Sequence, residues 1–218
     1  PFSILFRGCS SMIMYEAGVL AALQELSPDM LQRASRIYGA SSGSLIAVFS
    51  FFQCNIGKGS ALAFVLCLKR NTFMGFVPGG RILTLVRELL DRYLPSNAHQ
   101  LVSGKLHVIV TRVRDWSCVV LSDFTSREDL IQAIICSCFI PLYFGLLPPK
   151  YHGVRYVDGE LAMWRANLVS RTTITVSGFA GEYDICPKDS PAAFLTFQLS
   201  DCILYISKKN ICRLQYIF

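Results

Sequence analysis

A glycine- and serine-rich turn, GASSGSL at residues 39–45, constrains the fold more than any other stretch. A short apolar run ends just before it, and a longer apolar segment continues to residue 52. We expect a buried strand at residues 37–39 and a buried helix at residues 45–52. The sequence therefore predicts a sharp strand-to-helix turn with Ser41 at its apex, where Gly39 and Gly43 relieve the crowding on either side.

The rest of the chain alternates strand and helix patterns. Further strands are predicted at residues 2–6, 106–111, 118–121, 154–157 and 172–177, and the main further helices at residues 11–26, 58–69, 81–93 and 125–139. The first helix is expected to bury one face, formed by Met12, Tyr15, Val19, Ala22, Leu23 and Leu26. This alternation predicts an α/β fold with helices on both faces of the sheet.

Length and composition favour one main core. The chain has 218 residues, of which 52% are hydrophobic, enough apolar mass for one sizeable core and too little length for two comfortable domains. Regular periodicity weakens from residue 179 onward. We expect a main domain at residues 1–178 and a C-terminal extension at residues 179–218 that packs on it or continues from it.

Several classes of site are disfavoured by the pattern of residues. The nine cysteines include no CxxC pair and no Cys/His cluster with metal spacing, which argues against a disulfide framework and a metal site and favours reduced thiols in the cytosol. The net charge of +6 suits an anionic lipid surface. Without a basic run, a zinc finger or an RNP-like aromatic stretch, nucleic acid is not expected as a partner.

An uncharged run at residues 130–147 is long enough by count to suggest a transmembrane helix. Pro141 and Gly145 interrupt it. A buried helix followed by a turn and a buried strand explains the same run and is the interpretation we favour.

A serine nucleophile needs a base, and the sequence offers two kinds. A histidine triad would require His152 together with an earlier acid, Asp115, Asp123 or Asp129. The other choice is a carboxylate that acts on the serine directly, for which Asp158 is the best candidate because it ends a predicted buried strand. The alternative for Asp158 and the glycine after it is an ordinary turn.

An oxyanion hole is predicted in the loop after the first strand. Backbone N–H groups of Gly8, Cys9 and Ser10 precede a predicted helix and can converge on an anion at its N-terminus. The alternative is a simple strand-to-helix loop capped by serines.

The order of these three elements resembles the patatin-like phospholipases, and in particular their adiponutrin branch. The similarity extends over nearly the whole chain and includes residues 104–108, 119–149 (VVLSDFTSREDLIQAIICSCFIPLYFGLLPP), 153–159 (GVRYVDG) and 184–187. It implies a three-layer α/β/α patatin-like fold with a central, mostly parallel sheet, and a Ser-Asp dyad without histidine. The family's nucleophile falls on Ser41, its acid on Asp158 and its oxyanion loop on Gly8.

Three positions depart from the pattern of this branch. Its motif SGxG has serine where this chain has Arg7 and glycine where it has Ser10, and its DGG or DGA becomes Asp158-Gly159-Glu160. A positive φ at Ser10 would cost roughly 1–2 kcal/mol, and a misplaced oxyanion donor about 2.7–4 kcal/mol of transition-state stabilisation. Glu160 is expected either to raise the pKa of Asp158 by its charge or to point away into solvent.

The resemblance implies a lipid acyl hydrolase or transacylase, of the triacylglycerol lipase or phospholipase kind, that acts without metal or organic cofactor. The implied acyl donor is an acylglycerol or a phospholipid, with a ceramide as acceptor. The implied location is cytoplasmic and peripheral, on lipid droplets or membranes, and no protein co-activator is identified. The alternative is a pseudoenzyme that binds lipid droplets or membranes and has lost turnover through the changes at Arg7, Ser10 and Glu160.

Overall fold

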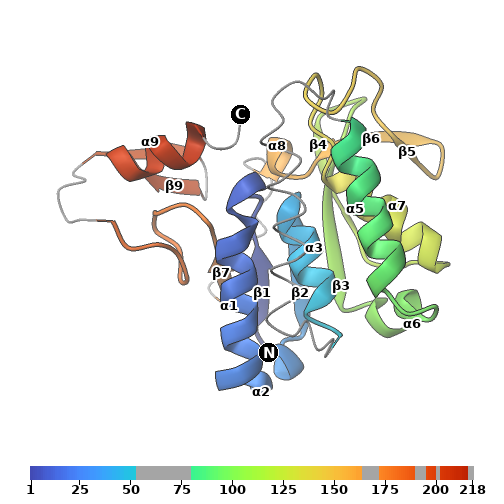
Figure 1. Cartoon of the computed structure of the whole chain (residues 1–218), viewed down its shortest axis with the longest axis horizontal. Coiled ribbons are helices and arrows are strands. Elements are labelled where there is room, and N and C mark those ends of the chain that lie inside the picture. The colour runs from blue at the N-terminus through green and yellow to red at the C-terminus, as the bar shows by residue number, and fades with distance from the viewer. Residues whose placement is uncertain (53–79, 164–171, 190–194, 200–201, 216–218) are drawn as a thin grey trace.

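A sheet with a parallel centre organises the chain in the computed structural model, which describes residues 1–52, 80–163, 172–189, 195–199 and 202–215 (Figure 1). The strands β1 (Ser3–Phe6), β2 (Arg36–Ala40), β3 (Leu106–Arg112) and β7 (Thr173–Val176) pair in parallel in the order β3-β2-β1-β7. Antiparallel strands continue from β3: β4 (Ser117–Leu121) and β6 (Val154–Asp158) pair with it, and β5 (Lys150–Tyr151) pairs with β6. The strands predicted at residues 2–6, 37–39, 106–111, 118–121, 154–157 and 172–177 are present, and the predicted mostly parallel centre is confirmed.

Helices cover the sheet and complete three layers. They are η1 (Ser10–Met12), α1 (Ile13–Leu26), α2 (Pro28–Arg33), α3 (Ser42–Phe49), α5 (Gly80–Tyr93), α6 (Ala98–Val102), α7 (Arg127–Ser137) and α8 (Glu160–Met163). Figure 1 shows α1, α3 and α5 in front of the sheet. Helix α7 shares the core with these three helices, while α8 packs on the other face. The helix predicted at residues 58–69 lies outside the described residues.

Side chains of the central strands point alternately to the two faces of the sheet and contribute to the core on each face. In β1, Ile4 and Phe6 belong to the main core under the large helices, whereas Leu5 faces a smaller cluster with Met163 of α8. Successive side chains of a strand point to opposite faces, so one short apolar strand can support both layers. This explains why β1 reads as a continuous apolar run rather than an alternating one.

The predicted buried face of α1 is only partly correct: Val19 and Leu23 pack against the main core, but the fully buried positions lie on the neighbouring face. The helix buries Ile13, Glu16 and Leu20, whereas Leu26, on the predicted face, is 77% exposed. Glu16 is fully buried, and burial raises its pKa well above the usual range. A glutamate on the core face interrupts the apolar periodicity of that face, so the apolar pattern in the sequence favours the neighbouring face.

The uncharged run at residues 130–147 forms most of α7 and the loop that follows it, so the expected buried helix and turn are present. The buried strand expected at the end of the run is wrong: these residues form a loop in which Leu146 and Leu147 are exposed. Of the helices in the described part of the chain, none has the length and apolar character needed to cross a membrane.

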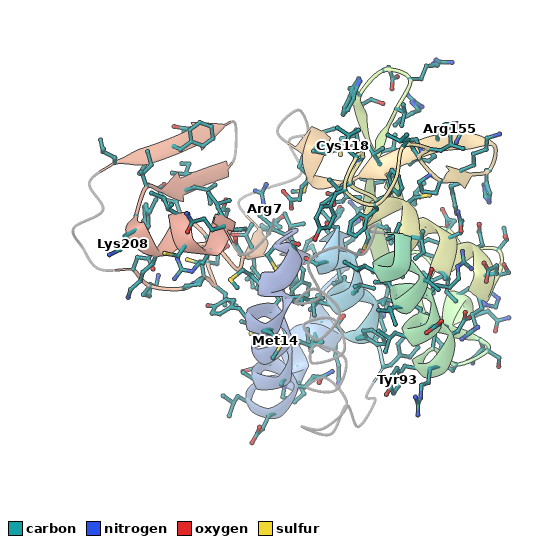
Figure 2. The ribbon with its side chains drawn as sticks, turned by 45° about the horizontal axis from the view of Figure 1, so that its top comes forward. Arg7, Met14, Tyr93, Cys118, Arg155 and Lys208 are labelled. Carbon is teal, nitrogen blue, oxygen red and sulfur yellow. The ribbon has the colours of Figure 1, made fainter. Side chains whose placement is uncertain are left out.

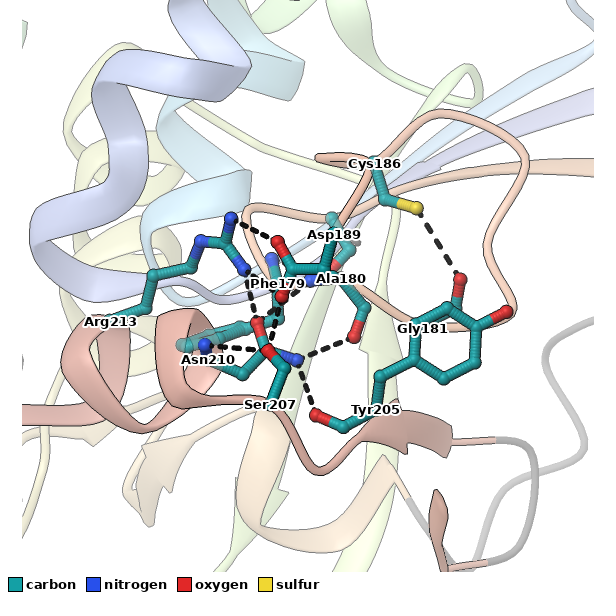
Figure 3. A network of polar contacts seen from close by, with 10 residues as sticks. Phe179, Ala180, Gly181, Cys186, Asp189, Tyr205, Ser207, Asn210 and Arg213 are labelled. Carbon is teal, nitrogen blue, oxygen red and sulfur yellow. Dashed lines mark hydrogen bonds and ion pairs between the residues drawn. The ribbon is translucent and has the colours of Figure 1, made fainter. Parts of the chain in front are cut away.

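The C-terminal residues form a small unit beside β7, made of the hairpin β8 (Thr196–Leu199) and β9 (Cys202–Tyr205) and the helix α9 (Lys208–Gln215) (Figure 1). Asn210 of α9 is buried at its centre (Figure 3). Its side-chain amide donates to the carbonyls of Ala180, at 2.7 Å, and Tyr205, at 2.8 Å, and its oxygen accepts from Ala180 N–H at 3.0 Å. One side chain thus joins the helix, the hairpin and the preceding loop.

Replacing this amide should loosen the C-terminal unit. In Asn210→Ala, backbone groups of Ala180 and Tyr205 lose buried partners, and we expect a loss of roughly 2–4 kcal/mol in the local opening free energy of residues 180–215. Amide hydrogen exchange measures it, with β1 and β2 as internal references. Asn97→Ala removes an exposed asparagine that makes no capping bond and serves as the control. Equal exchange in the two variants would contradict the role given to Asn210.

Candidate active site

The register of the sheet brings three loops to one level. Ala40 of β2 pairs with Ile109 of β3, so the next residue, Ser41, lies level with Val110, and Val110 pairs in turn with Asp158 at the end of β6. Neighbouring strands lie about 4.8 Å apart, so side chains from β2 and β6 can meet above β3. The pairing of Phe6 with Gly39 places the loop after β1 at the same edge.

Ser41 sits on a strained turn between β2 and α3, as predicted. Its backbone has φ 53° and ψ −130°, a conformation that L-residues rarely adopt. A Cβ on Gly43 would lie 2.3 Å from the carbonyl oxygen of Phe6, and one on Gly39 would lie 2.5 Å from the Cα of Ser44. Both glycines are therefore required by the close approach of backbone segments. The helix begins at Ser42, three residues before the predicted start.

Ser41 and Asp158 are in direct contact. The Ser41 hydroxyl donates a hydrogen bond of 2.5 Å to Asp158 Oδ2. Both residues are buried, with exposed fractions of 8% and 3%. The other carboxylate oxygen, Oδ1, accepts from the backbone N–H of Glu160 at 2.9 Å. Asp158 is thus held with one oxygen on the serine and the other on its own turn.

Burial makes Asp158 an unusually basic carboxylate. Desolvation raises its pKa to about 7, the nearby charge of Glu160 adds to the rise, and the hydrogen bond from Ser41 opposes it. The pKa is therefore raised mainly by burial, with the predicted like-charge effect of Glu160 as a smaller contribution. A carboxylate of this kind can accept a proton near neutral pH, as a general base must.

Two residues that the sequence analysis missed form hydrogen bonds with the backbone of the turn at Ser41. Ser137, at the end of α7, accepts a hydrogen bond from Ser41 N–H at 2.9 Å and donates to the carbonyl of Ile109 at 2.7 Å. The Cys138 thiol donates to the carbonyl of Ser41 at 3.3 Å, and the Ser44 hydroxyl donates to the same carbonyl at 2.6 Å. A lone serine in an apolar helix carries no recognisable pattern, so only the three-dimensional arrangement identifies it.

The N–H groups of the predicted oxyanion loop have different partners in the structure. Gly8 directs its N–H towards the site, where the carboxylate of Glu160 accepts it at 2.5 Å. Cys9 donates its N–H to the hydroxyl of Ser42 at 2.9 Å, so this group is used within the scaffold and is not directed at the site. Ser10 begins η1 with φ 47°, the positive value expected where the branch has glycine.

Glu160 contacts the site rather than pointing away into solvent. One carboxylate oxygen accepts from Gly8 N–H, and the other forms a 3.0 Å ion pair with Arg7 Nη2. Two of the three departures from the branch pattern therefore contact each other. Arg7 also lies over the ring of Tyr183, 5.5 Å from its centroid, between the main sheet and the C-terminal unit that carries Lys208 (Figure 2).

The histidine triad is contradicted. His152 is exposed and bonds Asp129 near the start of α7, with 2.9 Å between Nε2 and Oδ1. His107 bonds the carbonyl of Lys105, and its ring lies against that of Tyr38 at an angle of 49°. Within the described residues, no group of three or more histidine, cysteine or acidic side chains is placed to hold a metal ion.

The raised pKa of Asp158 predicts a pH-dependent cost to stability. In the native state the Asp158 carboxyl keeps its proton up to about pH 7, whereas in the unfolded chain it keeps the proton only up to about pH 4. The contribution of protonated Asp158 to the free energy of unfolding is therefore greatest below pH 4 and is lost as the pH rises to 7. Relative to Asp158→Asn, the wild-type free energy of unfolding should fall by about 3–4 kcal/mol over this range.

Urea unfolding from pH 4.5 to 8 measures this difference. The exposed Asp123→Asn is the control and should follow the wild type at every pH. Parallel curves for wild type and Asp158→Asn would show that the carboxyl titrates normally.

Known proteins are similar in sequence to this chain over most or all of its length. The patatin-like phospholipase family matches residues 4–164. Human omega-hydroxyceramide transacylase is 39% identical over 220 residues, covering 99% of this chain, and human 1-acylglycerol-3-phosphate O-acyltransferase PNPLA3 is 38% identical over 219 residues, covering 100% of it. Human patatin-like phospholipase domain-containing protein 2 is 38% identical over 216 residues, covering 98%.

The chain spans 41%, 46% and 43% of the lengths of these three proteins, respectively. The family match extends from β1 into the segment after α8 and so includes the loop of Gly8, the turn of Ser41 and Asp158. The chain therefore belongs to the patatin-like phospholipase family.

Proposed function

We propose that this chain is a lipid acyl hydrolase or transacylase in which Ser41 is the nucleophile and Asp158 the base. The observation that carries the proposal is the buried 2.5 Å hydrogen bond from the Ser41 hydroxyl to a carboxylate with a pKa raised to about 7. Covalent acyl transfer requires a nucleophile and a base within hydrogen-bonding reach of each other, and a third group that orients the base. Glu160 N–H is that third group.

The reaction begins with attack on an acyl ester. Ser41 Oγ adds to the carbonyl carbon as its proton passes to Asp158, and the negative charge on the carbonyl oxygen is stabilised by Gly8 N–H. Collapse of the tetrahedral species breaks the ester bond, and the leaving alcohol takes the proton from Asp158. The acyl group then remains on Ser41.

A hydroxyl compound completes the cycle. Asp158 takes a proton from water or from a lipid hydroxyl, which attacks the acyl-serine and receives the acyl group; the proton returns to Ser41. We propose acylglycerols or phospholipids as donors. A ceramide or another lipid hydroxyl is proposed as acceptor because an omega-hydroxyceramide transacylase and a 1-acylglycerol-3-phosphate O-acyltransferase are among the relatives.

A lipid surface is the proposed place of action, on the cytoplasmic side of droplets or membranes. The loop between α7 and β5 begins beside the site, since the carbonyl of Phe139 accepts the N–H of Asp158 at 2.8 Å. It exposes Leu142, Leu146 and Leu147 by 83%, 84% and 70%. Exposed leucines grouped in one loop are typical of surfaces that enter lipid.

A binding module without turnover is the second candidate. It is favoured by the occupation of Gly8 N–H by the Glu160 carboxylate, which leaves that donor unavailable to a substrate oxyanion. The two candidates differ in whether Ser41 reacts.

Labelling with a fluorophosphonate tests the nucleophile. We expect covalent labelling that is lost in Ser41→Ala and kept in Ser50→Ala, because the Ser50 hydroxyl bonds the carbonyl of Ala47 within α3's last turn. The rate should rise with pH through about 7, since only ionised Asp158 accepts the proton. Folded protein that stays unlabelled, both as wild type and as Glu160→Ala, would rule out the enzyme and leave the binding module.

Flotation with phospholipid vesicles tests the surface. Replacing Leu142, Leu146 and Leu147 together by serine should weaken binding at least about tenfold, because each leucine contributes roughly 1.5–3 kcal/mol when fully buried in an apolar phase. Leu26→Ser is the matched control: it is 77% exposed at the far end of α1, at the opposite edge of the sheet. Similar binding by the triple variant and wild type would contradict this surface.

A further inference from the structure

The carboxylate of Glu160 accepts the N–H of Gly8 next to the side chain of Ser41. A Cβ built on Gly8 would lie 2.5 Å from Glu160 Cγ and 2.8 Å from Ser41 Cβ. The glutamate side chain and the nucleophile therefore flank the same point beside Gly8. The oxygen that accepts Gly8 N–H lies where a carbonyl attacked by Ser41 would need that donor.

Arg7 holds the carboxylate in this position. Its guanidinium is paired with the second oxygen of Glu160 at 3.0 Å, and the two side chains are 8% and 25% exposed. Breaking a shielded pair leaves a poorly solvated cation, so the contact resists opening more than a surface ion pair would. Both residues are departures from the branch pattern, and the ion pair needs both of them, the guanidinium of Arg7 and the carboxylate of Glu160.

We propose that Glu160 and Arg7 form an internal latch that closes the oxyanion site, so that an acyl ester reaches Ser41 only after the Glu160 carboxylate leaves Gly8. The inference rests on the proposed function of Ser41. It adds that the described conformation is the closed form of the enzyme and that two residues outside the dyad set how often the site is open.

Opening requires movement of one side chain. The backbone of Glu160 is fixed because its N–H donates to Asp158 Oδ1. Its side chain is a quarter exposed, so the carboxylate has a route to solvent by rotation about the side-chain bonds. The dyad and the turn at Ser41 keep their geometry as the latch opens.

Fluorophosphonate labelling rates measure the latch, because the phosphonyl oxygen needs the same donor as an oxyanion. Glu160→Ala should label roughly ten- to a thousandfold faster than wild type, the range that one oxyanion donor controls. Glu160→Gln keeps the shape but removes the charge-assisted bonds, and should also be faster. Glu128→Ala, which removes a glutamate from the first turn of α7, is the matched control and should label at the wild-type rate.

A second variant tests the coupling. Arg7→Met should accelerate labelling in the presence of Glu160 and have no further effect in the Glu160→Ala background, because Arg7 acts by holding the carboxylate. Independent effects of the two substitutions would overturn the latch. Circular dichroism checks that each variant is folded.

The contact itself has a readout that does not depend on chemistry. The amide proton resonance of Gly8 should move upfield in Glu160→Ala, because a short hydrogen bond to a carboxylate is lost. An unmoved resonance would overturn the inference, as would equal Ser41-dependent labelling of wild type and Glu160→Ala; in the latter case the proposed function stands. No labelling in any variant overturns the proposed function and the latch with it.

Discussion

The parallel register of β1, β2 and β3 determines where the residues of the proposed active site meet. Because the pairing aligns the ends of these strands, the loops after β1 and β2 leave the sheet at one level, and β6 brings Asp158 to that level from the other direction. A slip of two residues in any pair would move a participating residue by almost 7 Å along its strand. The large core under α1, α3, α5 and α7 stabilises this register, and the short polar contacts at the edge are its consequence.

Burial of Asp158 makes the proposed base more basic and lowers the stability of the fold at neutral pH. Among the residues that the structure describes, ionised Asp158 loses solvation and receives the Ser41 hydroxyl and one backbone N–H in return. Its conjugate acid is therefore favoured until about pH 7, where the carboxylate is basic enough to take a serine proton and still frequently ionised. A more exposed aspartate would be ionised throughout and would be a weaker base.

Features that depend on local sequence could be predicted, and those that depend on distant side chains could not. The turn at Ser41 and the strand ending at Asp158 follow from apolar runs and glycines, so their positions were correct. The buried face of α1 was only partly correct because Glu16 interrupts the apolar pattern on the core side. The role of Glu160 could not be found, because nothing within a few residues of it indicates Gly8 as its partner.

The positive φ of Ser41 has a consequence for how the protein fails under stress. This conformation costs roughly 1–3 kcal/mol and persists only because β2, α3 and the end of α7 enforce it together. When any of these supports loosens, the turn can relax to an ordinary backbone geometry while most of the core remains packed. Heat inactivation should therefore precede loss of secondary structure, and brief warming would yield a folded but inert population.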